Sequence, residues 1–189
     1  VTDGLIRKGD SEIRAEGLYS LGYPRDDKGE EINARFRVVG RDLDSLRHAF
    51  ELDDWPVSGR LSGEFHLTGN YETPIGFGAM TVEDGVAYDE PFQRASASLR
   101  FDGRGVRLDG INMAKATGTV TGAAYVGWDG TYSFNADGRR IPAERVSLMA
   151  YEKVQPSGLL EFTAAGSSTF ENPRYDVRFQ MNRLAVAQE

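Results

Sequence analysis

Apolar and polar residues alternate along most of this 189-residue chain. Ile32, Ala34 and Phe36 alternate with Asn33 and Arg35, and the same period of two recurs in later segments. Successive side chains of a β-strand point to opposite faces, so this period predicts strands with one apolar and one polar face. Such alternation is typical of antiparallel sheets, because parallel strands that are covered on both faces are apolar throughout. We therefore predict an all-β, largely antiparallel fold.

The apolar residues that lie in phase on these segments define one continuous predicted surface. Its members are Ile32, Phe36, Val38, Leu61, Phe65, Leu67, Leu99, Phe101, Val120, Val126, Val177, Phe179 and Met181. Strands of about seven residues at about 3.3 Å per residue span roughly 23 Å, which is wide enough to curl around acyl chains. We expect the surface to line a groove for acyl chains if it is uncovered. A second sheet packed on it would instead make a sandwich, and the pattern alone does not separate these arrangements.

A set of residues recurs in the same order about 98 positions further along the chain. The matched residues include Phe36 with Phe134, Gly40 with Gly138, Arg41 with Arg139, Glu64-Phe65 with Glu161-Phe162, and Pro74 with Pro173. A nearly constant offset over several residue types predicts an array of structural units. We expect residues 1–35 to end a preceding repeat, 36–133 to form a complete unit, and 134–189 to begin the next, truncated one.

Two stretches, 42–50 and 142–150, break the period of two. Apolar residues lie three and four positions apart in them, and Pro142 suits the first turn of a helix. We predict one short helix in each repeat, docked on the sheet because about nine residues make a marginal helix alone. Asp-Gly pairs at 102–103 and 129–130 predict hairpin turns, and the pair at 84–85 predicts a third.

The composition narrows the classes of function. Glycine makes up 22 of the 189 residues, well above the usual share of about 7%, which favours many strands joined by tight turns. The chain has no cysteine, which excludes disulfides and a cysteine nucleophile. A net charge of −7 argues against a nucleic-acid partner. No run approaches the roughly 18 apolar residues of a membrane helix, so we expect any membrane anchor to lie outside this stretch.

Candidate catalytic residues are sparse. His48 and His66 fall in different kinds of predicted element, and a lone histidine without an oriented partner is usually a solvated side chain. The acidic pairs fall at turns or helix ends, where solvation and capping explain them. We therefore expect no enzymatic activity, no metal site and no cofactor. Trp55 and Trp128 are candidates for a carbohydrate platform, although closing the edge of a sheet explains them better.

Several signatures together resemble the repeats of TamB and AsmA-like proteins. They are Phe-x-x-x-Gly-Arg at 36–41, the short helix, Ser58-Gly59, Phe65-x-x-x-Gly69, Pro74 with Gly76 and Gly78, Pro91-Phe92, Gly118-x-x-x-Gly122, and 128–134 followed by Gly138 and Ile141-Pro142. The resemblance implies a periplasmic protein of diderm bacteria, anchored in the inner membrane by a segment not present here. It also implies a long, curved antiparallel sheet, folded like a half-pipe or taco with an apolar inner face.

The same resemblance implies movement of phospholipid toward the outer membrane or, for TamB, assembly of outer-membrane proteins with a barrel partner met through other regions. We therefore expect a non-enzymatic segment whose apolar groove conducts or shields phospholipid acyl chains between the two membranes, or supports that assembly. The alternative is a purely structural β-repeat array, an adhesin or spacer with a fully packed apolar face. A carbohydrate-binding or enzymatic β-sandwich is a third class, which no convergent polar cluster supports.

Overall fold

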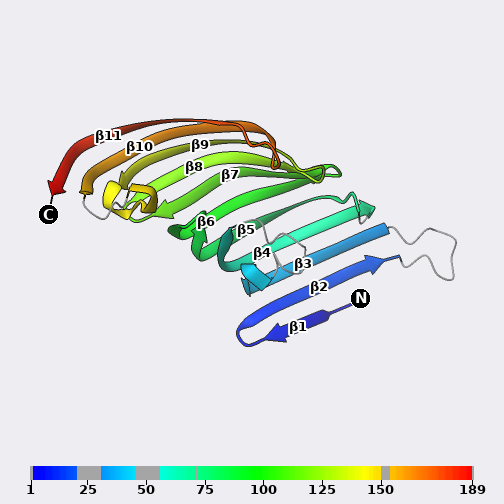
Figure 1. Cartoon of the computed structure of the whole chain (residues 1–189). Helices are drawn as coiled ribbons and strands as arrows, with labels where there is room; N and C mark the ends of the chain where they lie inside the picture. The colour runs from blue at the N-terminus through cyan, green and yellow to red at the C-terminus, as the bar shows by residue number, and fades with distance from the viewer. Residues whose placement is uncertain (1, 21–30, 46–55, 71, 150–153, 189) are drawn as a thin grey trace.

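The computed structural model describes residues 2–20, 31–45, 56–70, 72–149 and 154–188 (Figure 1). The described strands form a single open sheet in which each strand pairs antiparallel with the next one along the chain. They are β1 (Gly4–Lys8), β2 (Ser11–Tyr19), β3 (Glu31–Asp42), β4 (Val57–Asn70), β5 (Ile75–Ala87), β6 (Glu90–Asp102), β7 (Gly105–Lys115), β8 (Gly118–Gly127), β9 (Thr131–Pro142), β10 (Val154–Thr169) and β11 (Tyr175–Gln188). The prediction of an antiparallel all-β fold is confirmed.

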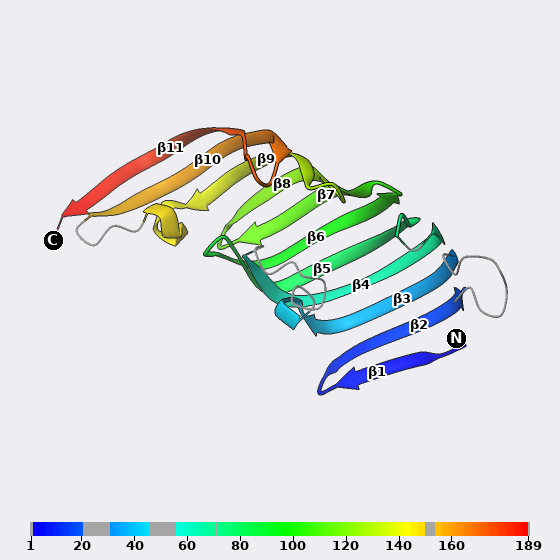
Figure 2. The same ribbon diagram turned by 45° about the vertical axis from the view of Figure 1, so that its right-hand side comes forward.

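The sheet is strongly curved along the strand order, as two views show (Figures 1 and 2). Register shifts interrupt six of its strand pairings, and five of these shifts include one of four glycines with positive φ, because two shifts share Gly110. These glycines are Gly40, Gly59, Gly110 and Gly158. A β-bulge inserts an extra residue, bends its strand and increases the local twist. Repeated bulges are therefore a local source of the curvature.

Two of the three predicted Asp-Gly turns are hairpins. The Asp102 carboxylate accepts hydrogen bonds from the backbone N–H groups of residues 104 and 105, and Asp129 closes the other turn through Thr131. The third prediction is wrong, because residues 84–85 lie within β5 and the chain turns at Tyr88-Asp89, both with positive φ. Gly85 is needed for packing instead, since a Cβ there would lie 2.1 Å from the Phe92 ring.

The predicted helices are only partly present. Residues 43–45 are helical, and the rest of the 42–50 segment, with His48 and Trp55, lies outside the described residues. At 142–149 two 3-10 turns replace the predicted α-helix: η1 (Ala143–Arg145) and η2 (Ser147–Met149). Val146 between them is extended, and the N–H of Leu148 donates to the Glu90 carboxylate rather than to a carbonyl of its own segment. Contacts with the sheet have outweighed the local helical preference.

The two predicted repeat units share an order of elements but not a register. A helical turn follows both β3 and β9, and each returns into a long strand. Phe36 lies opposite Phe65, so congruent units would place Phe134 opposite Phe162. Phe134 instead lies opposite Gly166, and Phe162 opposite Gly138. The repeat boundaries at 36 and 134 therefore stay a prediction.

The buried side chains lie on one face of this single layer. Leu61, Val82 and Phe92 form one cluster, against which Leu43 from the first helical turn packs. All the described strands belong to the one sheet, so within the described residues no second sheet covers this face. A compact monomer of 20.8 kDa exposes roughly 9,000 Å². This chain exposes 13095 Å², which is far more than a closed sandwich of its mass requires.

Candidate functional site: the apolar face of the sheet

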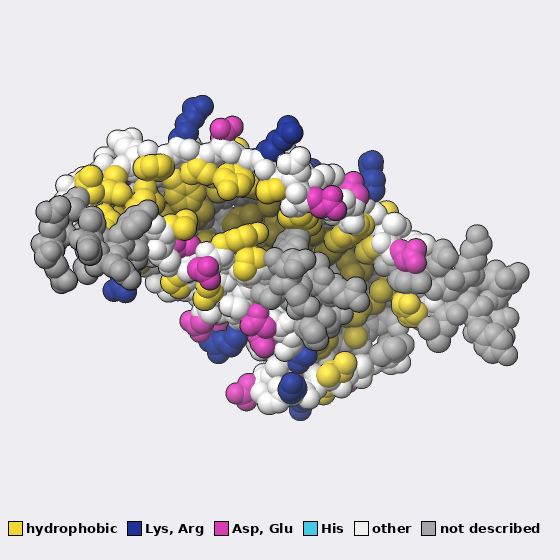
Figure 3. Space-filling model, viewed as in Figure 1, with side chains coloured by type: hydrophobic (Ala, Val, Ile, Leu, Met, Phe, Trp, Pro, Cys, Tyr) yellow, Lys and Arg dark blue, Asp and Glu magenta, His cyan; other side chains and the backbone are white. Residues whose placement is uncertain are grey.

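The strand register places all thirteen predicted groove residues on one face. Residues directly opposite each other in an antiparallel pair share a face, and so do alternate residues of one strand. Phe36 lies opposite Phe65, which lies opposite Gly78, which lies opposite Leu99, and the same tracing reaches β11. We call this side the apolar face. Figure 3 shows hydrophobic side chains gathered on the concave inner side of the curved sheet.

Exposure varies across the apolar face. Leu61 and Leu99 are each 8% exposed in the middle of the sheet. At the two ends of the strand order, by contrast, Ile6 of β1 is 66% exposed and Phe179 of β11 is 69% exposed. Both outermost strands thus present large apolar side chains to whatever surrounds the protein.

Phenylalanine rings lie over glycines on this face. Four cross-strand pairs show the arrangement: Phe65 with Gly78, Phe92 with Gly85, Phe134 with Gly166, and Phe162 with Gly138. A Cβ added to any of these glycines would lie between 2.1 and 2.8 Å from the ring. An aromatic ring that covers a cross-strand glycine shields its backbone and pins the register. The result is a wall of rings and small residues, which accounts for part of the glycine excess.

A hollow of about 470 Å³ lies on the apolar face where residues of β5 to β11 meet the segment that follows β9. We call residues 143–149 the cap. The sheet contributes Val120, Ile141, Leu160, Phe162, Val177 and Phe179 to the lining, and the cap contributes Val146, Leu148 and Met149. Predicted groove residues therefore meet here with cap residues that were predicted only to pack on the sheet.

Polar contacts tie the cap to β6 and to the turn before it, and β7 joins them through Lys115. One oxygen of Glu90 accepts a hydrogen bond from the Leu148 N–H at 3.0 Å, and the other accepts one from Lys115 Nζ at 2.7 Å. Lys115 Nζ also donates to the carbonyl of Pro91 at 2.9 Å, and the Ser147 hydroxyl donates to the carbonyl of residue 89 at 3.0 Å. We call Glu90, Lys115, Ser147 and Leu148 the clasp. Lys115 is buried, so its charge depends on Glu90 for compensation.

The clasp shifts the ionisation of Glu90. Partial burial raises the pKa of this carboxyl, but the hydrogen bond from Lys115 and those from the backbone N–H groups of Leu148 and Ser147 outweigh it. The pKa of Glu90 therefore lies below its ordinary value of 4.5. Interactions that favour the charged form stabilise the fold only while that form is present.

We expect the clasp to weaken in acid. Because the pKa of Glu90 is lower in the folded chain, its contribution is complete above about pH 4.5 and is lost as the pH falls through the folded pKa. Glu12, Asp102 and Asp129 have lowered pKa values too, so the informative quantity is a difference between variants. As the pH is lowered through this range, the melting temperature of Glu90→Gln should fall less steeply than that of the unaltered chain. An equal fall for the two chains would show that the ionised Glu90 carboxylate adds no stability.

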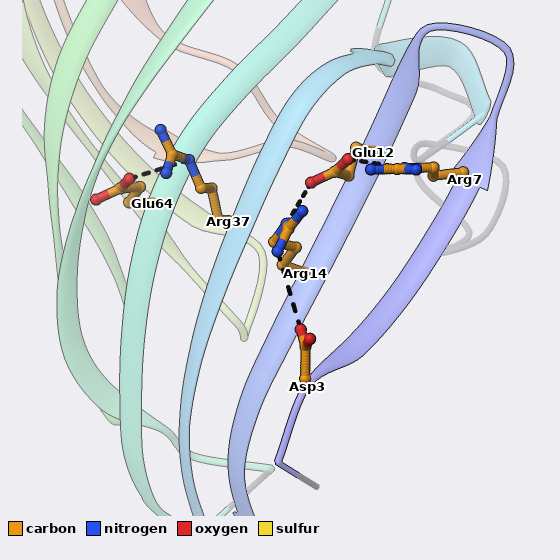
Figure 4. A network of polar contacts seen from close by, with 6 residues as sticks. All are labelled: Asp3, Arg7, Glu12, Arg14, Arg37 and Glu64. Atoms are coloured by element: carbon orange, nitrogen blue, oxygen red, sulfur yellow. Dashed lines mark hydrogen bonds and ion pairs between the residues drawn. The ribbon is translucent and has the colours of Figure 1, made fainter.

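The opposite face is polar and carries ion pairs (Figure 4). Glu12 bridges Arg7 and Arg14, which lowers the pKa of its carboxyl, chiefly through the hydrogen bond from Arg14. Arg37 on β3 pairs with Glu64 on β4 at 3.3 Å. These groups are solvated, and exposed pairs of this kind contribute little to stability. They give this face charged groups that water can solvate, whereas the apolar face carries mainly hydrocarbon side chains.

The other candidates that the structure describes, His66 and Trp128, lie in separate contacts. His66 Nε2 lies 3.1 Å from the side-chain oxygen of Asn33, and its ring meets Phe77 edge-on. In the part of the chain that the structure describes, no group of three His, Cys, Asp or Glu residues is placed to hold a metal ion. Trp128 stacks against Phe101 with ring centroids 6.5 Å apart. That contact extends the apolar face toward the Asp129-Gly130 turn.

Sequence reasoning missed several residues of the hollow. Leu160 and Phe162 alternate in phase on β10, directly opposite Met181 and Phe179, so the period of two was the signal that identifies them. The cap residues gave no such signal, because their position depends on how β9 ends. Arg41 also lies on this face, opposite Leu61, and its buried Nε has no hydrogen-bond partner among the described residues. In β9 the corresponding place, opposite Leu160, is taken by Ile141.

The fold and this face define a single, open antiparallel β-sheet whose apolar positions share one face. Comparison with protein-family models, with curated proteins and with solved structures gives no match for this chain. Among the described residues, no helix has the length and hydropathy needed to cross a membrane.

Proposed function

We propose that the apolar face binds phospholipid acyl chains and conducts or shields them between the inner and outer membranes of a diderm bacterium. In this proposal the chain is a non-enzymatic, periplasmic stretch of a longer half-pipe built from units of about 98 residues. Anchoring in the inner membrane, and support of outer-membrane protein assembly through a barrel partner, would fall to other regions. Residues 36–133 would form one full unit, flanked by parts of two others.

One observation carries the proposal: the strand register gathers the apolar positions on one face of a curved single layer, and at its two ends Ile6 and Phe179 are exposed. Monomeric soluble proteins rarely expose a contiguous apolar patch larger than a few hundred Å², and larger patches usually mark binding surfaces. Each CH₂ group that moves from water onto such a surface contributes about 0.8 kcal/mol. The rings over glycines make the wall smooth, which favours sliding over tight capture.

The proposal is tested by photo-crosslinking at residues of similar exposure on opposite faces. A diazirine amino acid at Phe179, which is 69% exposed on the apolar face, is expected to capture phospholipid in the periplasm of a diderm bacterium. Phe77, which is 64% exposed on the polar face, is the control and is expected to capture little. Ile6 and its neighbour Leu5, on the apolar and polar faces of β1, repeat the comparison at the other end of the sheet.

Each outcome of this experiment separates the proposal from the structural alternative. Capture at Phe179 and Ile6, but not at Phe77 and Leu5, supports lipid binding by the apolar face. Capture of protein instead of lipid at Phe179 and Ile6 would favour a structural array, in which a further layer of protein covers this side. Equal lipid capture from both faces would contradict the proposal, since it would reflect general contact with membrane.

A further inference from the structure

The hollow beneath the cap differs from the rest of the apolar face because it is enclosed on a second side. Leu148 and Met149 come from the cap, and Phe162 and Phe179 come from the sheet below it. Its volume of about 470 Å³ falls in the range of roughly 300 to 1,000 Å³ that is typical of small-molecule sites. This part of the face therefore has the dimensions of a binding site.

The chemistry of the lining selects the kind of occupant. Only Glu90 and Lys115 bring charged groups to the hollow. Both oxygens of Glu90 accept hydrogen bonds, and Lys115 Nζ already donates to Glu90 and to Pro91. A peptide would bring backbone N–H and C=O groups that need partners, and leaving them unpaired in an apolar site is costly. A water molecule in the hollow would also lack the polar partners that it needs. A hydrocarbon chain requires no partner.

The cap itself is arranged as an incomplete cover. Leu148 lines the hollow, yet it is 81% exposed, and Phe179, which also lines it, is 69% exposed. An acyl chain lying between them would remove apolar surface of both residues from water, which is favourable in proportion to the area buried. Meanwhile the backbone of Leu148 is fixed by Glu90, so the leucine is held over the hollow before any ligand arrives.

From these observations we infer that the hollow is a discrete site for one acyl-chain segment, and that the clasp holds the cap closed over it. The inference rests on the proposed function and adds to it a defined site at which one acyl chain is held. A chain that enters or leaves sideways requires the cap to lift, and lifting separates Leu148 and Ser147 from β6. Breaking the Glu90 contacts is then the step that sets how quickly the chain is released.

The absence of cysteine in the chain allows a direct test with single-cysteine variants. A bimane dye is attached at Leu148→Cys, at Arg145→Cys and at Ile6→Cys. The probe is a vesicle of phosphatidylethanolamine and phosphatidylglycerol in which some acyl chains carry a nitroxide, which quenches the dye on contact. Arg145 is the matched control, because it belongs to the same cap but lines a different depression, beside Glu144. Ile6 reports on the apolar face far from the hollow, at the other end of the strand order.

We expect strong quenching at residues 148 and 6 and little at residue 145. Quenching at residue 6 with no more at 148 than at 145 would overturn the inferred site while leaving the proposed function intact. No quenching at 148 or at 6 would overturn both. Quenching at 145 equal to that at 148 would also overturn the site, since the cap would then simply lie against the membrane.

The role of the clasp is tested by the rate at which quenching at residue 148 disappears after unlabelled vesicles are added in excess. We expect Glu90→Ala to release the labelled chain about tenfold faster than the unaltered chain, because the cap then loses its charged acceptor. Glu83→Ala, a change on the neighbouring strand outside the clasp, is the control. A thermal melt of each variant verifies folding. An unchanged release rate in a folded Glu90→Ala variant would overturn the inference that the clasp holds the site closed.

Discussion

Replacement of Ile141 by aspartate is expected to lower the free energy of unfolding by about 4 kcal/mol or more. Ile141 is 2% exposed at the end of β9, and it lies beside Ala143, which is 1% exposed, and opposite Leu160, which is 6% exposed. The substitution removes a packed side chain and introduces a carboxylate, and Lys115, the cation that lines the same hollow, is already paired with Glu90. Such a group must either be protonated or force the strand end open to water. Urea unfolding followed by circular dichroism measures the change.

The matched control for this prediction is the adjacent residue. Arg140 is exposed and has a φ of 52°, a left-handed conformation that aspartate tolerates better than most residues. We therefore expect Arg140→Asp to change the free energy of unfolding by about 0.5 kcal/mol at most. A similar loss for the two variants would show that added negative charge, rather than burial of Ile141, controls stability at this end of the sheet.

Replacement of Gly138 by valine is expected to cost about 1 to 3 kcal/mol of stability, even though valine favours strands. The added Cβ would lie 2.1 Å from the Phe162 ring, so the ring has to leave its place over the glycine. In the Gly138→Val chain, further replacement of Phe162 by alanine should then cost less than it does in the unaltered chain. A double-mutant cycle by urea unfolding measures this coupling, which we expect to be at least about 1 kcal/mol.

Ala136, two residues earlier on the same face, provides the control for this cycle. It lies opposite Ala164 and not opposite a phenylalanine, so Ala136→Val should show little coupling to Phe162→Ala. Additive effects of the Gly138 and Phe162 substitutions would contradict the inference that rings over glycines hold neighbouring strands in register. They would also remove the basis for describing the apolar face as a smooth wall.

Ile141 and Phe162, the subjects of these two predictions, both line the hollow, so the substitutions also affect the proposed binding site. Ile141 supports the start of the cap, and Phe162 forms part of the floor. The Glu90–Lys115 pair, by comparison, is only partly buried at Glu90, but removing Glu90 leaves the buried Lys115 ammonium without its charge partner. We therefore expect changes at Glu90 to alter both the lifetime of a bound chain and the stability, and changes at Ile141 to alter stability first.

The sequence by itself determined which residues share a face. Alternation is a property of the extended backbone, so the in-phase positions of Ile32 to Met181 could be assigned without knowing any strand partner. The turns at Asp102-Gly103 and Asp129-Gly130 could be predicted for the same reason, because an aspartate that bonds to the next backbone N–H groups is a local contact. The all-β class and the single apolar face followed from these local rules.

Only the tertiary structure decided the register, the cap and the hollow. A register shift by any even number of residues keeps every side chain on its face, so alternation is blind to the difference between Phe36 opposite Phe65 and Phe134 opposite Gly166. The cap became two 3-10 turns because Leu148 found a partner in Glu90, 58 residues earlier in the chain. Such contacts depend on which strands become neighbours after folding, and no local pattern contains that information.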